Sequence, residues 1–297
     1  MVCDTVMLNA AKMIARFMGL NTTELYQSLS AKSLDAAAKE QGLTETIGKL
    51  RDIIPDLRDQ YTESFDETEY QRYWEKKMRG LHAWQVNCVQ EAMRVIDRKN
   101  LVLVDIGDSS GNHGIYFRDI SPSGQVSKVI SVNLDPVAVG KVKSKGGEAI
   151  LSRAEELDLH GVKVDLFMSF ETVEHLTDPT RFLHELAIKG DAEHLFMSVP
   201  YRKTSRFGGF HMRQDESKML NKMTAEEVHI YEFSPEDWVL LARFAGFKPV
   251  FTRTYFQYPK RSPLRLTAPL WRKLDFEGFF GVLLKRDLGL AVKYTGW

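Results

Sequence analysis

The sequence predicts a doubly wound α/β sheet that follows a helical N-terminal region. The first observation is a series of short apolar segments rich in β-branched residues, which begins after Asn100. Such runs are typical of strands that a parallel sheet buries on both faces. The second observation is that stretches with helical character separate these segments, as an alternating α/β fold requires. Because right-handed crossovers bring the carboxyl ends of parallel strands to one edge, we expect ligands to bind there.

The expected elements follow in order along the chain. Apolar residues recur at helical spacing from Met7 to Met18, two or three short helices fit residues 22–57, and two further helices fit residues 67–79 and 81–96. Strands are expected at residues 101–107, 129–134, 148–151, 164–170, 195–199, 247–256 and 279–284. Between them, helices fit residues 136–145, 179–188 and 235–246. Residues 201–223 form a long polar and basic connection, and such connections are usually functional or mobile.

Composition narrows the class of protein. The 40 Lys and Arg residues balance 40 Asp and Glu residues, so no overall charge attracts nucleic acid or an anionic membrane. Two cysteines indicate neither a disulfide framework nor a spaced set of metal ligands, so we expect a cytoplasmic setting and no metal. No apolar run reaches the roughly 18 residues of a membrane-spanning helix. Asp4, Lys12 and Arg16 do not fit a secretory signal.

The most informative segment is a glycine turn after the first expected strand, Asp105-Ile106-Gly107-Asp108-Ser109-Ser110-Gly111. Glycine allows a tight turn and a close approach of the ligand, and the next helix offers free N–H groups. Glycines at 107, 111 and 114 do not fit the G-x-G-x-x-G dinucleotide motif. Asp105 would repel a pyrophosphate and attract the ammonium of a methionine moiety. The turn therefore favours a zwitterionic ligand over NAD, and an ordinary turn with a capping aspartate is the alternative.

This turn resembles the first motif of class I S-adenosylmethionine-dependent methyltransferases, D/E-x-G-x-G-x-G, with Ser109 in place of the middle glycine. A second segment closely resembles the E-x-x-E-H-L-x-D-P turn of small-molecule methyltransferases, namely Glu171-Thr172-Val173-Glu174-His175-Leu176-Thr177-Asp178-Pro179. Residues 195–200 and 229–238 resemble later family segments. Together these ordered motifs extend the resemblance over residues 80–285.

The resemblance implies a fold, a cofactor and a set of contacts. The fold is a Rossmann-like, seven-stranded, mostly parallel sheet at residues 81–297, preceded by a helical extension or lid at residues 1–80. The cofactor is S-adenosyl-L-methionine. Asn133 stands where the family has an acidic residue that binds the ribose hydroxyls, and Asp135 either replaces it in part or is an ordinary turn aspartate. The implied cofactor contacts are Asp105, Gly107, Ser109, Gly111, Asn133, Asp135, Ala154, Glu155, Phe170 and Glu171.

Methyl transfer to a hydroxyl group benefits from a general base, and histidine suits this role near neutral pH. Three histidines are candidates: His175 beyond the fourth strand, His211 in the polar connection, and His229 before the next helix. Each also has a structural interpretation: a residue that fixes the turn, a solvated loop residue, and a packing or hydrogen-bonding residue. The basic stretch at residues 201–206 either meets an anionic acceptor or is a solvated loop.

These observations predict a cytoplasmic enzyme that O-methylates a sugar, a nucleotide-linked sugar or a similar polar metabolite. Its expected partner is that small-molecule acceptor, with no nucleic acid and no membrane span. Two alternatives stay open, a quinone or lipid-type acceptor and a non-catalytic binding or scaffold module. The second follows from the departures from the family pattern at Ser109 and Asn133. The N-terminal helices, residues 1–65, have three open roles: covering the active site, forming a homodimer or docking a partner.

Overall fold

The computed structural model describes residues 21–60, 70–157, 161–224, 228–269, 271 and 277–297. The helix expected near Met7–Met18 lies outside the described residues. Of the helices that are described, none is both long and apolar enough to cross a membrane.

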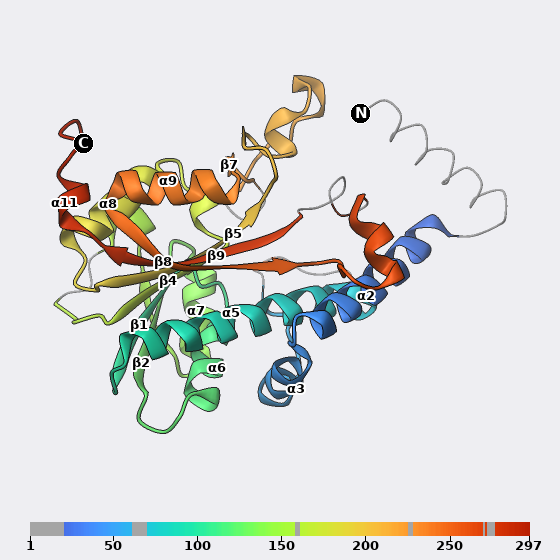
Figure 1. Ribbon diagram of the computed structural model, residues 1–297, viewed down its shortest axis with the longest axis horizontal. Coiled ribbons are helices and arrows are strands. Elements are labelled where there is room, and N and C mark those ends of the chain that lie inside the picture. Colours follow the sequence, from blue (N-terminus) through green and yellow to red (C-terminus); the bar gives the residue numbers. More distant parts are fainter. Residues whose placement is uncertain (1–20, 61–69, 158–160, 225–227, 270, 272–276) are drawn as a thin grey trace.

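A seven-stranded sheet forms the centre of the molecule (Figure 1). Its strands lie in the order β3-β2-β1-β4-β5-β9-β8, and β9 is antiparallel to both of its neighbours. This confirms the predicted fold. The order reverses between β1 and β4, and doubly wound sheets bind ligands at such a switch point. The strands are β1 (Leu101–Ile106), β2 (Val126–Asn133), β3 (Glu148–Leu151), β4 (Leu166–Phe170), β5 (His194–Tyr201), β8 (Phe247–Phe256) and β9 (Gly278–Arg286).

Helices cover both faces of this sheet. In Figure 1, α5 and α6 lie along one face, and α8 and α9 lie along the other. Each face has its own apolar core, with Trp84 and Phe117 buried on the first and Phe182 and Trp238 on the second. The helices are α2 (Thr22–Glu40), α3 (Thr44–Ile53), α5 (Glu75–Ile96), α6 (Asn112–Ile120), α7 (Pro136–Ser144), α8 (Pro179–Lys189), α9 (Pro235–Ala245) and α11 (Leu288–Ala291).

Short elements fill the connections. A small second sheet pairs β6 (Arg206–Phe207), near the start of the long polar connection, with β7 (Tyr231–Glu232), which follows it in the sequence. The short helical turns are the π-helical η1 (Tyr70–Trp74) and the 3-10 turns η2 (Ala154–Glu156), η3 (Val173–His175), η4 (His211–Arg213), η5 (Glu216–Lys218) and η6 (Pro263–Thr267).

The helix α5 differs from the prediction. Two helices were expected to meet at Gly80, but η1 leads into one helix that passes through this glycine. An internal glycine costs a helix about 1 kcal/mol relative to alanine, so its presence requires a reason. A Cβ atom at Gly80 would lie 2.4 Å from the hydroxyl oxygen of Tyr255. The glycine therefore lets β8 approach α5, and the boundary expected at residue 80 falls inside a helix that joins the extension to the sheet.

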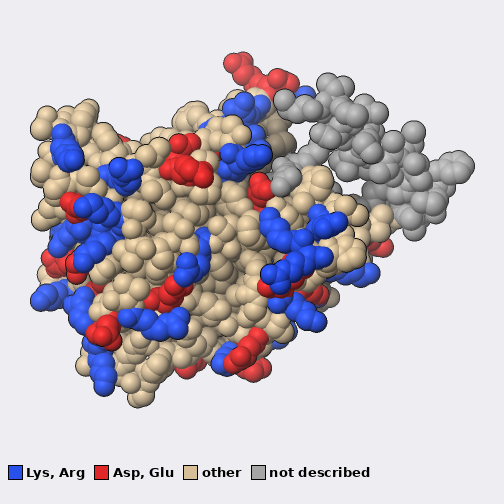
Figure 2. All heavy atoms as spheres, viewed as in Figure 1, with Lys and Arg blue, Asp and Glu red and all other residues tan. Residues whose placement is uncertain are grey.

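The N-terminal extension packs on the segment that follows β8. The Glu40 carboxylate accepts hydrogen bonds from the backbone N–H groups of residues 260–262. Gln41 pairs with both backbone groups of Phe256, at 2.9 Å each. These contacts attach α2 to the sheet through its edge strand. On the face shown in Figure 2, basic and acidic side chains of the described residues are intermixed, in keeping with the balanced composition.

Candidate active site

The carboxyl ends of β1, β2 and β4 border a cavity of about 1030 Å³. Pockets that hold a drug-sized ligand measure about 300–1,000 Å³, so this cavity has room for a cofactor together with a small acceptor. Its walls come from three parts of the chain. The loops after the strands form one wall, the region of Trp74 and Lys77 forms another, and residues 212, 222–224 and 228–230 contribute the third.

Two glycines shape the turn between β1 and α6. Gly107 has a φ of +95°, and a Cβ atom there would lie 2.0 Å from Thr172 Oγ1. Gly111 has a φ of +74°, and its missing Cβ would lie 3.3 Å from Val142. Left-handed backbone at both positions and close packing at the first explain why the sequence has glycine there.

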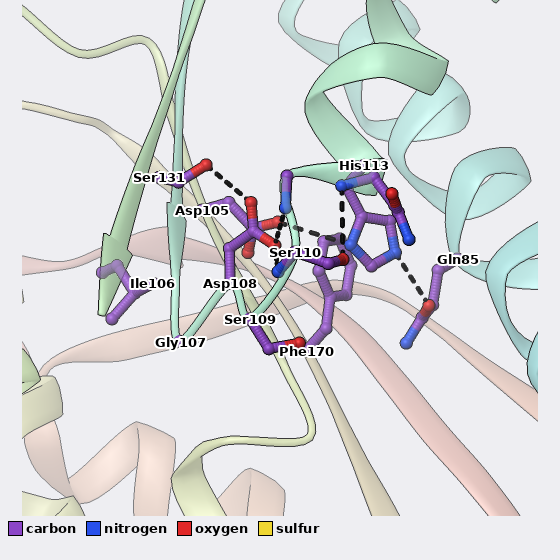
Figure 3. A network of polar contacts seen from close by, with 12 residues as sticks. Gln85, Asp105, Ile106, Gly107, Asp108, Ser109, Ser110, His113, Ser131 and Phe170 are labelled. Carbon is purple, nitrogen blue, oxygen red and sulfur yellow. Dashed lines mark hydrogen bonds and ion pairs between the residues drawn. The ribbon is translucent and has the colours of Figure 1, made fainter. Parts of the chain in front are cut away.

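Asp108 holds the turn together. Its Oδ1 atom accepts hydrogen bonds from the backbone N–H groups of Ser110 and Gly111, at 3.0 and 2.8 Å. Its Oδ2 atom accepts a 2.6 Å bond from the Ser131 hydroxyl on β2, as Figure 3 shows. Asp108 was not among the predicted site residues, although an aspartate that bonds to N–H groups two and three residues ahead is a common turn signal.

Ser109, the residue that departs from the family motif, connects the turn to the N-terminal extension. Its hydroxyl donates a 2.6 Å hydrogen bond to the Gln60 carbonyl oxygen. The Gln60 side chain in turn accepts hydrogen bonds from Ser110 and Asn112, and Lys145 forms an ion pair with Asp59. A glycine at position 109 would lack the hydroxyl that anchors this segment.

A chain of polar contacts runs from Asp105 into the core (Figure 3). Asp105 Oδ2 lies 3.4 Å from His113 Nδ1, and His113 Nε2 lies 3.0 Å from Gln85 Oε1. An amide oxygen can only accept, so Nε2 donates. Burial, followed by the charge of Asp108, raises the pKa of Asp105 to about 6. Burial alone would lower the pKa of His113, but the adjacent Asp105 carboxylate raises it above the usual value.

Glu171 continues this network at the carboxyl end of β4. Its carboxylate accepts hydrogen bonds from Ser198 at 2.7 Å and from the Gln85 amide at 2.5 Å. Burial raises the pKa of Glu171 to about 7. Its backbone has a φ of +46°, which is uncommon for a residue with a side chain and recurs at functional sites.

The structure brings most of the predicted cofactor residues together. All of them except Gly111 line the cavity. Asn133 donates from its amide to the Asp108 carbonyl oxygen at 3.0 Å, and it accepts from the Asp135 N–H at 2.8 Å. Asp135 caps α7 by accepting from Val137. One contact of Asp135 is therefore that of an ordinary turn aspartate. The role of Asp135 in binding the ribose hydroxyls stays a prediction.

The cavity walls suit the groups of S-adenosylmethionine. Asp105 Oδ2 and Glu155 Oε1 are buried and have no hydrogen-bond partner among the described residues, although Asp105 Oδ2 lies near His113. Both residues line the cavity, so each retains an acceptor for an ammonium or amino group. Leu134 and Phe170 add apolar surface beside them. These residues fit a ligand that combines a zwitterion with an aromatic base.

The three candidate bases differ in their positions relative to the cavity. His175 and His229 both line the cavity, with ring centroids 4.6 Å apart. His211, in η4, is not among the lining residues, although its neighbour Met212 is. Burial, followed by His229, lowers the pKa of His175 to about 3. A histidine with such a pKa holds a proton poorly at neutral pH, which weighs against His175 as the general base.

Glu174 belongs to the family motif but was not among the predicted site residues. It is fully buried, it lines the cavity, and it lies beside His175 and His229. These three side chains form a group that could hold a metal ion, although the sequence predicted none.

Comparison with known proteins agrees with the motifs. Residues 104–188 match the family of a methyltransferase domain. No curated protein matches the chain. A complex of the Haloferax volcanii Trm112 methyltransferase activator with a methyltransferase is similar at 15% identity and a TM-score of 0.49, covering 78% of this chain and 98% of that one.

Two further solved structures are similar. An S-adenosylmethionine-dependent methyltransferase from Clostridium acetobutylicum has 10% identity and a TM-score of 0.46, covering 68% of this chain and 90% of that one. The second is the 1,6-didemethyltoxoflavin-N1-methyltransferase of Burkholderia thailandensis with bound 1,6-didemethyltoxoflavin and S-adenosylhomocysteine. It has 15% identity and a TM-score of 0.45, covering 76% of this chain and 92% of that one. Such distant similarities do not identify an acceptor.

Within the chain, residues 104–188 therefore match a methyltransferase domain, and the seven-stranded sheet that contains them has the doubly wound order described above.

Proposed function

We propose that the protein transfers the methyl group of S-adenosylmethionine to a hydroxyl group of a polar metabolite, such as a sugar or a nucleotide-linked sugar. The observation that carries this proposal is the continuity of the cavity. One end borders the glycine turn, and the same cavity reaches the polar group of Glu174, His175 and His229. An acceptor with hydroxyl groups would find polar partners there.

When bound, the cofactor supplies a methyl group on a positively charged sulfur, which is already activated for displacement. The cofactor would present this methyl group to an acceptor oxygen held at the end of the cavity that Glu174, His175 and His229 line. The protein contributes mainly orientation, because holding two reactants in line supplies much of the acceleration. Glu171 and the glycine turn border the cofactor end, and the histidines border the acceptor end.

Calorimetric titration with S-adenosylhomocysteine tests the cofactor site, using wild type beside Asp135→Asn. Asparagine keeps the cap of α7 but loses the carboxylate. Charge-assisted hydrogen bonds are roughly twice as strong as neutral ones, so we expect binding about tenfold weaker. Asp178→Asn is a matched control, because Asp178 also caps a helix and precedes a proline but does not line the cavity. We expect its affinity to equal that of wild type.

Labelled cofactor then tests the acceptor. We expect incorporation of the methyl group into sugars or nucleotide-linked sugars, with an alkali-stable ether in the product. Incorporation into a quinone or lipid precursor instead would replace the acceptor class and keep the enzyme. A folded wild-type protein that fails to bind S-adenosylhomocysteine would contradict the proposal and favour a non-catalytic binding module.

A further inference from the structure

A carboxylate without a partner lies at the acceptor end of the cavity. Glu174 is 0% exposed, and neither of its carboxylate oxygens has a hydrogen-bond partner among the described residues. The side chain nonetheless lines the cavity. Removing a carboxylate from water is strongly unfavourable unless it gains a proton, hydrogen bonds or a cation. The described side chains supply no hydrogen-bond donor to either oxygen, which leaves a proton or a bound cation to stabilise this group.

Two histidines adjoin this carboxylate. One ligand atom from each of Glu174, His175 and His229 lies within 4.8 Å of the other two. His175 Nε2 lies 3.7 Å from Glu174 Oε1. Tetrahedral ligands about 2.0–2.1 Å from a zinc ion lie roughly 3.3 Å from one another. Side-chain rotations that draw the ligand atoms together by up to about 1.5 Å would thus place all three around one ion.

The outer nitrogens of the two histidines face acceptors. His175 Nδ1 lies 2.9 Å from the Val228 carbonyl oxygen, which can only accept, so Nδ1 carries the proton and Nε2 carries the lone pair. His229 Nδ1 lies 3.8 Å from Glu232 Oε1, and the buried Glu232 also pairs with Arg206. Histidines that bind metals usually donate their other N–H to a carbonyl or a carboxylate, which fixes the ring. His175 shows this pattern, and the Nδ1 atom of His229 lies near a carboxylate oxygen, at 3.8 Å.

The backbone brings the ligands together from distant parts of the sequence. The Ile230 N–H donates a 2.9 Å hydrogen bond to the Glu174 carbonyl oxygen. Together with the bond between His175 and Val228, this contact fixes the residues on both sides of His229 against η3. His229 is thus held beside the motif by main-chain contacts that do not depend on its own ring.

From this geometry we propose that Glu174, His175 and His229 bind a divalent first-row transition-metal cation. Two imidazoles and one carboxylate are a ligand set that suits zinc and similar ions better than magnesium or calcium, which prefer oxygen ligands alone. Three protein ligands leave at least one coordination position open, and the group lines the cavity. In a step that rests on the proposed function, this position takes an oxygen atom of the acceptor.

Metal binding is tested directly on the full chain after dialysis against a chelator. Zn²⁺ is titrated in competition with a chromophoric chelator, and Co²⁺ is followed by its visible absorption. We expect a single equivalent of each ion, and a Co²⁺ spectrum that indicates nitrogen ligands. Glu174→Gln and His229→Gln should each weaken Zn²⁺ binding by about 100-fold or more. The matched control is His211→Gln, which removes a histidine of the polar connection that lies outside the group and should bind Zn²⁺ like wild type.

Thermal unfolding separates lost ligands from lost folding. Glu174→Gln replaces a buried carboxylate by a neutral amide of the same shape. The metal-free variant should therefore melt no lower than metal-free wild type, and Zn²⁺ should raise the melting temperature of wild type alone. The proposal is overturned if wild type binds no equivalent of either ion, or if both variants retain wild-type affinity. S-adenosylhomocysteine binding in the same samples keeps the two proposals separate, because loss of that binding with metal binding retained would contradict only the proposed function.

Discussion

The replacement Gly107→Ala tests whether the glycine turn is shaped by contact as well as by backbone conformation. The new methyl carbon would lie 2.0 Å from Thr172 Oγ1 and less than 3 Å from two further atoms of that side chain. Such overpacking costs about 1–3 kcal/mol. The left-handed backbone at a φ of +95° adds about 1–2 kcal/mol for a residue with a Cβ atom. We therefore expect the free energy of unfolding to fall by about 2–5 kcal/mol, which the midpoint of urea unfolding measures.

Two further variants separate these contributions. Gly124→Ala has a similar backbone, with a φ of +76°, but its Cβ would meet nothing within 4 Å, so only the conformational cost of about 1–2 kcal/mol should appear. Thr172→Gly removes all three contacted atoms, so the double variant with Gly107→Ala should be less destabilised than the sum of the single variants. If Gly107→Ala and Gly124→Ala destabilise equally, close packing against Thr172 does not explain the glycine.

Three more predictions concern side chains that hold the N-terminal extension or the turn in place. Arg79 is fully buried and donates to carbonyls at the end of α3, so Arg79→Met should lower the free energy of unfolding by about 3 kcal/mol in urea, with Arg79→Lys recovering only part. Because the pKa of His113 is raised in the folded protein, protonation of this ring stabilises the fold at pH values below the pKa of the ring in the unfolded chain. This contribution is lost as the pH rises through the pKa of the ring in the folded protein. Asp105→Asn should therefore lower that pKa in an NMR titration of the ring, and an unchanged value would refute the pairing. Ser109→Gly should speed hydrogen exchange at Gln60 without lowering the melting temperature by more than a few degrees, and unchanged exchange would show that the serine is not an anchor.

The sequence predicted the sheet because its signals are local. The strands at residues 148–151 and 247–256 have the expected bounds, and the others differ by a few residues at their ends. Apolar runs and their separation report burial on both faces of a sheet, which is a property of each segment by itself. The same reasoning failed at Gly80, because the reason for that glycine is a contact with Tyr255, far away in the sequence.

The residues of the candidate site, like the strands, could be predicted where the signal in the sequence is local. The motifs identified nine residues that line the cavity, since each motif follows a strand whose end lies at the ligand-binding edge. No local signal could assign Gln60 to the turn, because its contacts with Ser109 and Asn112 join the extension to the sheet. His211 and His229 are equally plausible bases in the sequence. The pairing of β6 with β7 and the contacts beside η3 bring His229 to the cavity, and His211 is not among the lining residues.

The two glutamates of the E-x-x-E-H motif show why spacing alone does not assign roles. Glu174 is fully buried and Glu171 is half-buried, and burial raises the pKa of both carboxyl groups. Glu171 is satisfied by Ser198 and Gln85 and belongs to the network that reaches Asp105. Glu174 finds no such donor among the described residues and faces two histidines instead. Because the first carboxylate already has hydrogen-bond donors and the second does not, the difference in their surroundings places the cation at Glu174 and leaves Glu171 to the cofactor end of the cavity.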